Sequence, residues 1–318
     1  MNQKTLMIKP DITSMLMKED SDYLYYVAKT LQVYDLKNDR TIQRLPGTYN
    51  SMITISNDGS LLVCVHPVKT KTEFIFYHVE GLLIEVRRKI INTPISVFDP
   101  TISSDNQYAF FCGDDNSIWK VAVSSGDTEC IFRCRENEII TSMDLNDQGI
   151  LISVYNVSGH FHDSFVLLLD HNGIIVRKYG FIAAKLNDIK LRNIGCIRIS
   201  ETSFVCLLRT ISDGKLRSSL QTIPFCFTES INADNMQKPL DFDFYPYTIC
   251  VSENMNYLAL GGIKAVDNEY KRIVSVYSLP SFDLSVVEYF NKLRSLCFSK
   301  SSSTLLICYE KQSFVKFP

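Results

Sequence analysis

The chain has no excess of charge of one sign and no long apolar run. Its 33 basic and 35 acidic side chains leave a formal net charge of −2, which argues against a nucleic-acid-binding surface over much of the molecule. No apolar stretch approaches the roughly 20 residues that cross a bilayer, and Met1–Leu6 is too polar to begin a signal peptide. We therefore expect a soluble, cytoplasmic protein with no transmembrane segment and no nucleic-acid partner.

Histidine and the common catalytic motifs are also scarce. The sequence contains only five histidines and has no Gly-rich phosphate loop, no His-Glu-x-x-His and no Gly-x-Ser-x-Gly. His160 and His162 would face the same side of a strand beside Asp163, but two imidazoles are fewer than the protein ligands that a metal site needs. We interpret His160 and His162 as part of an exposed polar loop that contributes to partner binding, and we expect no metal and no cofactor.

What the sequence does have is a repeated unit, in which an apolar run ends in a small polar turn and a second apolar run follows. The units recur at a spacing close to that of a four-stranded propeller blade, roughly 40–45 residues. Their turns are Glu19–Asp22 (a looser copy), Ser56–Gly59, Ser103–Asn106, Asn146–Gly149, Ser200–Ser203, Ser252–Met255 and Ser299–Ser302. Asp-Gly and Asp-Asn pairs between apolar runs favour β-hairpins, because Gly and Asn adopt positive φ at little cost. The pattern predicts an all-β propeller.

Each unit can be divided into four strands, and the two ends of the sequence suggest how the last unit is completed. In the second unit the strands are Met52–Ile55, Leu61–Val65, Glu73–Val79 and Leu82–Lys89. The last unit supplies three strands, whereas residues 4–9 precede the first unit and have no other role. We therefore expect a single domain, residues 1–318, that forms a seven-bladed β-propeller closed by the N-terminal strand, with residues 4–9 completing the last blade.

Most of the ten cysteines adjoin the repeat turns, where a small buried hydrophobe fits. These are Cys64, Cys112, Cys196, Cys206, Cys250, Cys297 and Cys308. Cys130 and Cys134 lie four apart in a strand-like stretch, hence roughly 13 Å apart and too far for a disulfide. We expect reduced, structural cysteines, in agreement with a cytosolic compartment.

One segment carries a resemblance to a known family. Leu31–Arg40 resembles the third strand and turn of a WD-repeat protein, with Tyr34 where the family has Trp. Trp119, the single tryptophan, falls at the same place in its own unit, and Tyr77 and Tyr277 fill it in two others. The chain is thus similar to the broad WD-like and YVTN-like propeller group. It lacks the family's Gly-His dipeptide and keeps its Asp only as Asp35, so we expect the blades to be held by apolar packing between sheets.

The first strands of the blades would line a central channel, where propeller-type enzymes work. The charged residues that the sequence places there are Lys18, Glu19, Asp99, Asp144, Arg198, Lys292 and Arg294. No histidine is among them, and metal-assisted chemistry needs about three converging ligands. We interpret Asp144 and Arg198 as a structural ion pair and expect no catalytic residue in the channel.

The strongest basic run is Arg87–Lys89, at the end of an outer strand. Paired arginines bind phosphoinositides in some propellers, but the Phe-Arg-Arg-Gly sequence of those proteins is absent. We interpret the run as charge that protects the edge of a solvated outer strand.

Two longer loops between second and third strands, His66–Thr72 and Gly261–Arg272, are predicted to emerge on one propeller face. We therefore predict a non-catalytic protein-interaction platform, a WD-repeat-like scaffold or adaptor, that binds a protein or peptide on this face and acts as a monomer within a larger complex. The predicted partner-binding residues are Lys69, Lys71, His160, His162, Lys264, Tyr270, Lys271 and Arg272. Two alternatives stay open: a small-molecule hydrolase or lyase acting at the channel, and a binder of anionic lipid surfaces.

Overall fold

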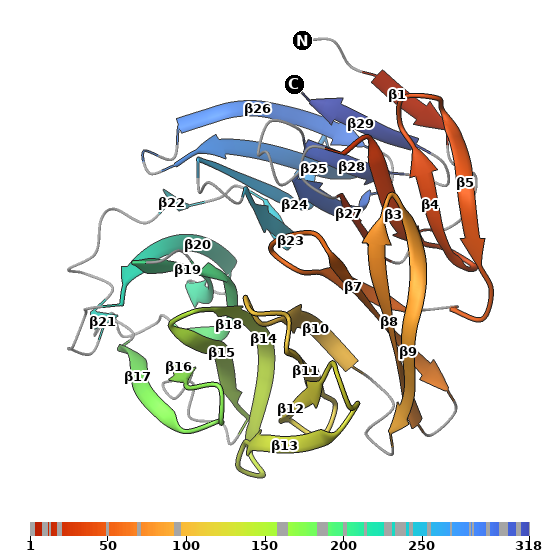
Figure 1. The fold of residues 1–318 in the computed structure, drawn as a ribbon. Helices are drawn as coiled ribbons and strands as arrows, with labels where there is room; N and C mark the ends of the chain where they lie inside the picture. The colour runs from red at the N-terminus through yellow and green to blue at the C-terminus, as the bar shows by residue number, and fades with distance from the viewer. Residues whose placement is uncertain are drawn as a thin grey trace. The chain divides into compact units, whose positions relative to one another are not determined.

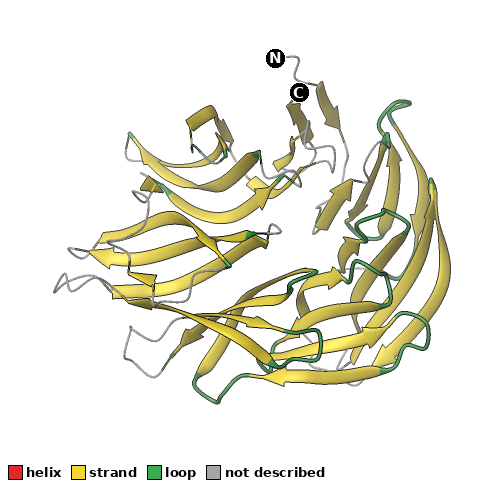
Figure 2. Cartoon of the chain, turned by 60° about the vertical axis from the view of Figure 1, so that its left-hand side comes forward, coloured by secondary structure: helices red, strands yellow, loops and turns green. Residues whose placement is uncertain are grey.

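The computed structural model describes residues 4–7, 12, 14–17, 21–48, 51–68, 71–91, 97–157, 165–182, 190–199, 202–212, 215–225, 231–232, 240–241, 244–252, 256–267, 269–279, 281, 283–290, 293–298, 305–309 and 313–317. In these residues the regular structure is β-strand throughout (Figures 1 and 2). The same residues include no helix that is long and apolar enough to span a bilayer. The chain forms two compact units: unit 1 is Met1–Ile95, Val123–Gly126 and Pro246–Pro318, and unit 2 is Ser96–Ala122 and Asp127–Tyr245.

Unit 1 holds four sheets of four strands each, in the orders β2-β3-β4-β5, β6-β7-β8-β9, β23-β24-β25-β26 and β27-β28-β29-β1. Their strands are β1 (Lys4–Met7), β2 (Ser14–Met17), β3 (Tyr23–Val27), β4 (Leu31–Asp35), β5 (Arg40–Leu45), β6 (Met52–Ile55), β7 (Leu61–Val68), β8 (Lys71–Glu80), β9 (Leu82–Ile91), β23 (Tyr245–Val251), β24 (Tyr257–Val266), β25 (Glu269–Ser278), β26 (Asp283–Phe290), β27 (Leu293–Phe298), β28 (Leu305–Tyr309) and β29 (Ser313–Phe317). The N-terminal strand β1 pairs antiparallel with β29, from Lys4 opposite Lys316 to Met7 opposite Ser313.

Unit 2 holds three sheets, in the orders β10-β11-β12-β13, β14-β15-β16-β17-β21 and β18-β19-β20-β22. Their strands are β10 (Val97–Ile102), β11 (Tyr108–Gly113), β12 (Ser117–Ala122), β13 (Thr128–Arg133), β14 (Glu138–Asn146), β15 (Gly149–Asn156), β16 (Phe165–Leu169), β17 (Ile175–Ile182), β18 (Lys190–Ile199), β19 (Ser203–Ser212), β20 (Lys215–Pro224), β21 (Ile231–Asn232) and β22 (Leu240–Asp241). The pairing of β17 with β21 is parallel.

The prediction of a seven-bladed propeller is wrong. Within the described residues, five sheets contain four consecutive strands: β2–β5, β6–β9, β10–β13, β14–β17 and β23–β26. The remaining two are assembled differently, because β18–β20 take a two-residue fourth strand and β27–β29 take theirs from the N-terminal end of the chain. The fold is therefore an all-β propeller with five complete blades. Within the described residues, the outer strand of the β18–β20 sheet is therefore only Leu240–Asp241.

The five complete blades share a bulge between the third and fourth strands. The register shifts beside Tyr34, Tyr77, Trp119 and Tyr277 in four blades and beside Leu169 in the fifth. The four aromatic residues are those that the sequence placed in the family's Trp position. An extra residue in the outer strand bends that strand and increases its twist. The aromatic position thus marks the place where each outer strand bends.

The repeat turns are closed by their serine side chains. The Ser56 hydroxyl donates to Asp58 Oδ1 at 2.6 Å and accepts the Leu61 N–H at 2.9 Å. Ser103 makes the equivalent pair of contacts. Gly59 in the first of these turns has φ 69, a conformation that glycine adopts without strain. Since Ser56 and Ser103 are buried, their hydroxyls replace water as partners of the turn's polar groups.

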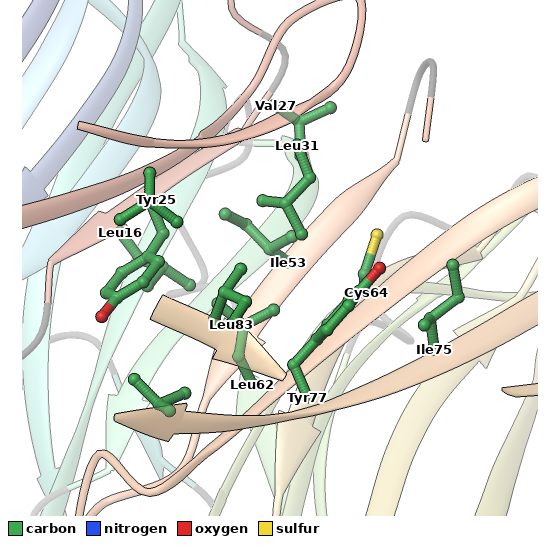
Figure 3. Packing of buried hydrophobic residues seen from close by; sticks show 12 residues of the cluster. Leu16, Tyr25, Val27, Leu31, Ile53, Leu62, Cys64, Ile75, Tyr77 and Leu83 are labelled. Atoms are coloured by element: carbon green, nitrogen blue, oxygen red, sulfur yellow. The ribbon is translucent and has the colours of Figure 1, made fainter. Parts of the chain in front are cut away.

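Apolar packing between neighbouring sheets forms the core, as the missing Gly-His dipeptide suggested. In unit 1, Tyr25 of β3, Leu62 of β7 and Tyr77 of β8 belong to one cluster between the β2–β5 and β6–β9 sheets (Figure 3). In unit 2, Phe110 of β11 and Ile152 of β15 belong to a similar cluster. Each such side chain contributes about 1.5–3 kcal/mol when it leaves water. This packing stabilises the inner parts of the sheets, and the hairpin ends lie outside the clusters.

Three of the described cysteines agree with the sequence analysis, whereas Cys134 and Cys250 are half-buried and Cys130 is exposed. Cys64, Cys112 and Cys206 are buried in the strands that follow repeat turns, and all three are free thiols. Burial raises the pKa of the Cys64 thiol to about 12, because the thiolate is poorly solvated there. These cysteines therefore serve as small core residues.

Candidate partner-binding surface

The predicted loop Gly261–Arg272 is mostly strand, which corrects the sequence analysis. β24 and β25 each run for 10 residues and pair from Tyr257 opposite Ser278 to Val266 opposite Glu269. The two glycines and the charges of this stretch suggested a loop. Gly261 and Gly262 instead lie opposite Val274 and Ile273, whose burial holds the strands in place. The turn is confined to the residues between Val266 and Glu269.

The β24–β25 hairpin is buried at its base and exposed at its end. Leu258 and Leu260 at the base have no exposed surface, whereas the side chain of Tyr270 is 84% exposed. Asp267 begins the turn with φ 51, a left-handed conformation that Asp tolerates better than most residues. A paired hairpin that is anchored in a core presents its end residues with little freedom of the main chain.

The register divides the predicted binding residues between two faces of this hairpin. Tyr270 lies opposite Ala265 and Arg272 lies opposite Ile263, so Tyr270 and Arg272 share one face. Lys264 and Lys271 lie directly opposite each other, and they share the other face with Glu269. We call the first of these faces, with Ala265, Tyr270 and Arg272, the Tyr270 face. It combines an exposed aromatic ring with a guanidinium group and a small opposing side chain.

The second predicted loop, His66–Thr72, is also mostly strand. β7 continues to Val68, which pairs with Lys71 at the start of β8. Lys71 is exposed at the end of this hairpin. Lys69, His160 and His162 lie outside the described residues. The structure thus places Lys71 on one hairpin end of unit 1 and the four residues from Lys264 to Arg272 on another.

Among the residues predicted to line the channel, the structure describes the side chains of Asp99 and Asp144. Asp99 Oδ2 accepts the Met143 N–H at 2.9 Å, which links β10 to β14. Burial raises the pKa of Asp99 to about 6, the Met143 N–H opposes that shift, and the nearby Asp144 adds to it. The structure does not describe the side chains of the other five, which are Lys18, Glu19, Arg198, Lys292 and Arg294. The described residues contain no group of three or more His, Cys, Asp or Glu side chains that could hold a metal.

The sequence analysis missed a surface on the outer strand β9. Leu82, Ile84 and Val86 of this strand are 46%, 51% and 56% exposed. The sequence feature that could have indicated this surface is the apolar run before Arg87–Lys89. An apolar run on an outer strand cannot be buried on both faces of the sheet. Its position at a sheet edge makes it a second candidate for binding.

Comparisons with known proteins support the fold. No family model and no curated protein matches the sequence. A structure of U3-55K superposes with a TM-score of 0.68 at 11% identity, covering 100% of this chain and 98% of that one. A crystal structure of RRP9 WD40 repeats gives 0.68 at 12% identity, with 99% and 97% covered.

A third structure, hydrazine synthase from Kuenenia stuttgartiensis, gives a TM-score of 0.68 at 11% identity and covers 98% of this chain and 96% of that one. At such identities the likeness shows the fold alone, and this fold carries unrelated functions. The predicted resemblance to WD-repeat-like propellers is confirmed at that level: the chain has a β-propeller fold like that of WD40 repeat structures, with a highly divergent sequence.

Proposed function

We propose that this protein is a non-catalytic interaction platform that binds a protein or peptide through the Tyr270 face of the β24–β25 hairpin. The supporting observation is that Tyr270 is 84% exposed although it lies in a regularly paired strand. Tyr and Arg are the residue types that most often contribute the binding energy at protein interfaces. Tyr270 and Arg272 stand side by side on one face of the hairpin, so both can contact the same partner.

The strand pairing also favours binding energetically. Ordering a flexible loop on binding costs free energy that weakens the complex. Here the main chain on both sides of Tyr270 is already paired with β24, from Glu269 opposite Val266 to Arg272 opposite Ile263. Tyr itself has only two side-chain torsions to fix, so a large contact area is gained at a small entropic cost.

The proposal ranks above the two alternatives on charge and geometry. Asp99 is the described acid with a raised pKa, but its carboxylate already accepts the Met143 N–H. The lipid-binding alternative would use Lys69, Lys71, Lys271 and Arg272, but Lys271 and Arg272 lie on opposite faces of the hairpin, and Glu269 shares the face of Lys271 and reduces its positive charge. The proposal includes the cytoplasmic location and the membership of a larger complex that the sequence suggested.

Site-specific photocrosslinking in the protein's own cells tests this proposal. A benzophenone amino acid is placed at Tyr270, and a matched control at Leu284 of β26, an exposed position in the same sheet. We expect one dominant crosslinked protein from position 270 and none of it from position 284. Equal crosslinking from both positions, or none from position 270, would contradict the proposal.

A further inference from the structure

The edge of β9 is open and unusually apolar. β9 is the last strand of its sheet, beside β8, and within the described residues no strand pairs with its other side (Figure 1). Leu82, Ile84, Val86 and Ile90 are 46%, 51%, 56% and 50% exposed. An open edge strand with exposed apolar side chains is the kind of element to which an extended peptide can add.

One position of this edge already holds a peptide-like group. The Val79 N–H donates to the main-chain oxygen of Ser60, the residue before β7, at 2.8 Å. Val79 and its partner Leu83 are therefore a non-hydrogen-bonded pair, and the main-chain groups of Leu83 point outward. The side-chain amide of Gln43 fills this position: the Leu83 N–H donates to Gln43 Oε1 at 2.8 Å, and Gln43 Nε2 donates to the Leu83 oxygen at 2.9 Å. A primary amide offers the same donor and acceptor as a peptide group, so the edge geometry accepts a peptide.

The next outward positions are unoccupied. Along β9, residues whose main-chain groups bond to β8 alternate with residues whose main-chain groups point outward. The bulge at Val86 shifts this alternation by one residue. The outward residues after Leu83 are therefore Glu85, Arg88 and Ile90. No described residue forms a hydrogen bond with these groups. The free edge therefore extends from Glu85 to Ile90, directly beyond the position that Gln43 covers.

The charges beside this edge favour an acidic partner. Arg88 is already paired with Glu85 at 2.8 Å and with Glu73 at 3.3 Å. Arg87 and Lys89 lie together on the opposite side of the sheet, and neither forms an ion pair with a described residue. Antiparallel pairing of β9 with β9 of a second copy, with Arg88 opposite Ile90, would place Lys89 against Lys89. Like charges in that position oppose association in that register, whereas a partner with acidic side chains would neutralise both Arg87 and Lys89.

We propose that an extended segment of another protein, in which acidic residues alternate with apolar ones, adds as a strand to the edge of β9. Its main chain pairs with Glu85, Arg88 and Ile90, and its carboxylates lie against Arg87 and Lys89. This surface is separate from the Tyr270 face and takes a partner of different chemistry.

The test measures fluorescence anisotropy with a labelled, acetylated peptide of alternating Val and Glu. Wild type should bind it saturably, with a dissociation constant below about 1 mM. Ile90→Pro removes an outward N–H that the sheet does not use, a position where an edge strand tolerates proline, and should weaken binding at least tenfold. Ile90→Val keeps that N–H and should bind like wild type. The double variant Arg87→Glu with Lys89→Glu should also bind at least tenfold more weakly.

A second pair of probes keeps the test decisive if Ile90→Pro does not fold. The peptide is N-methylated at all odd or at all even residues, which removes the N–H groups of one edge only. Binding should be lost with one methylated peptide and kept with the other; equal behaviour of the two overturns the proposal. So does the absence of saturable binding to wild type, or unchanged binding by folded Ile90→Pro. Tyr270→Ala should bind the peptide normally, so a failure here is distinct from a failure of the proposed function.

Discussion

Asp99→Asn should stabilise the protein at neutral pH, and the size of the effect can be worked out from the structure. The pKa of Asp99 is raised from 3.8 to about 6, chiefly by burial and further by Asp144. A shift of one pKa unit corresponds to about 1.4 kcal/mol, which gives an upper bound of about 3 kcal/mol for the cost of the buried charge. Because Asp99 keeps some exposed surface, a gain of about 1–2 kcal/mol is the working expectation.

The sign of the pH dependence follows from the direction of the shift. Between pH 4 and pH 6 the folded protein binds more protons at Asp99 than the unfolded chain, so wild-type stability falls as pH rises through this range. The asparagine side chain of the variant would carry no charge, would still accept the Met143 N–H, and would tolerate the φ of 49 at this position. The advantage of the variant should therefore be largest above pH 7 and vanish near pH 4.

Urea denaturation of wild type and Asp99→Asn at pH 8 and pH 4 measures both the gain in the free energy of unfolding and its dependence on pH. Asp99→Ala is the matched control, because it removes the charge and also leaves the Met143 N–H without its acceptor. Asp99→Asn should exceed Asp99→Ala in stability at both pH values. The reasoning is refuted if Asp99→Asn is less stable than wild type at pH 8, or if its gain is the same at both pH values.

Three further substitutions test the packing and the turns by urea or thermal denaturation. Tyr25→Phe should change stability by less than about 1 kcal/mol or raise it, because the buried Tyr25 hydroxyl has no hydrogen-bond partner among the described residues; a clear loss would contradict this. Ser56→Ala should cost about 1–2 kcal/mol, because the hydroxyl is the buried acceptor of a main-chain N–H in its turn, and an unchanged midpoint would count against that role. Gly173→Ala should cost more than about 2 kcal/mol, because a Cβ at φ 83 would lie 2.0 Å from the Ile131 oxygen. Gly180→Ala is its matched control, since no atom of the part of the chain that the structure describes lies within 4 Å of a Cβ there, and equal losses for both would refute the steric argument.

Local chemistry made much of the fold predictable from the sequence. Ser56–Gly59 and Ser103–Asn106 specify tight turns through their own side chains and through residues that adopt positive φ. The aromatic residues at Tyr34, Tyr77 and Trp119 mark the bend of each outer strand. The turns depend on neighbours a few residues away, so the sequence pattern was sufficient for them, whereas the bulge beside each aromatic residue is visible only in the strand register.

The errors arose where distant residues decide the outcome. The charges of Lys264 and Lys271 suggested a loop, but pairing between β24 and β25 makes this stretch a hairpin. The amide of Gln43 covers Leu83, 40 positions further along the chain, and no local pattern indicates that contact. The burial of Asp99 likewise depends on β14. The candidate site was predicted as a set of residues, whereas their division between two hairpin faces required the strand register.

The most direct test of the interaction platform is the affinity of the crosslinked partner for wild type and for Tyr270→Ala combined with Arg272→Ala. A residue that anchors an interface typically contributes 2 kcal/mol or more, about thirtyfold in affinity. Calorimetric titration should show at least that loss with a melting temperature close to that of wild type, because Tyr270 is 84% exposed and Arg272 is only half-buried. Lys271→Ala, on the opposite face of the hairpin, should bind within about threefold of wild type. Equal affinities for wild type and the double variant would contradict the assignment of the binding surface.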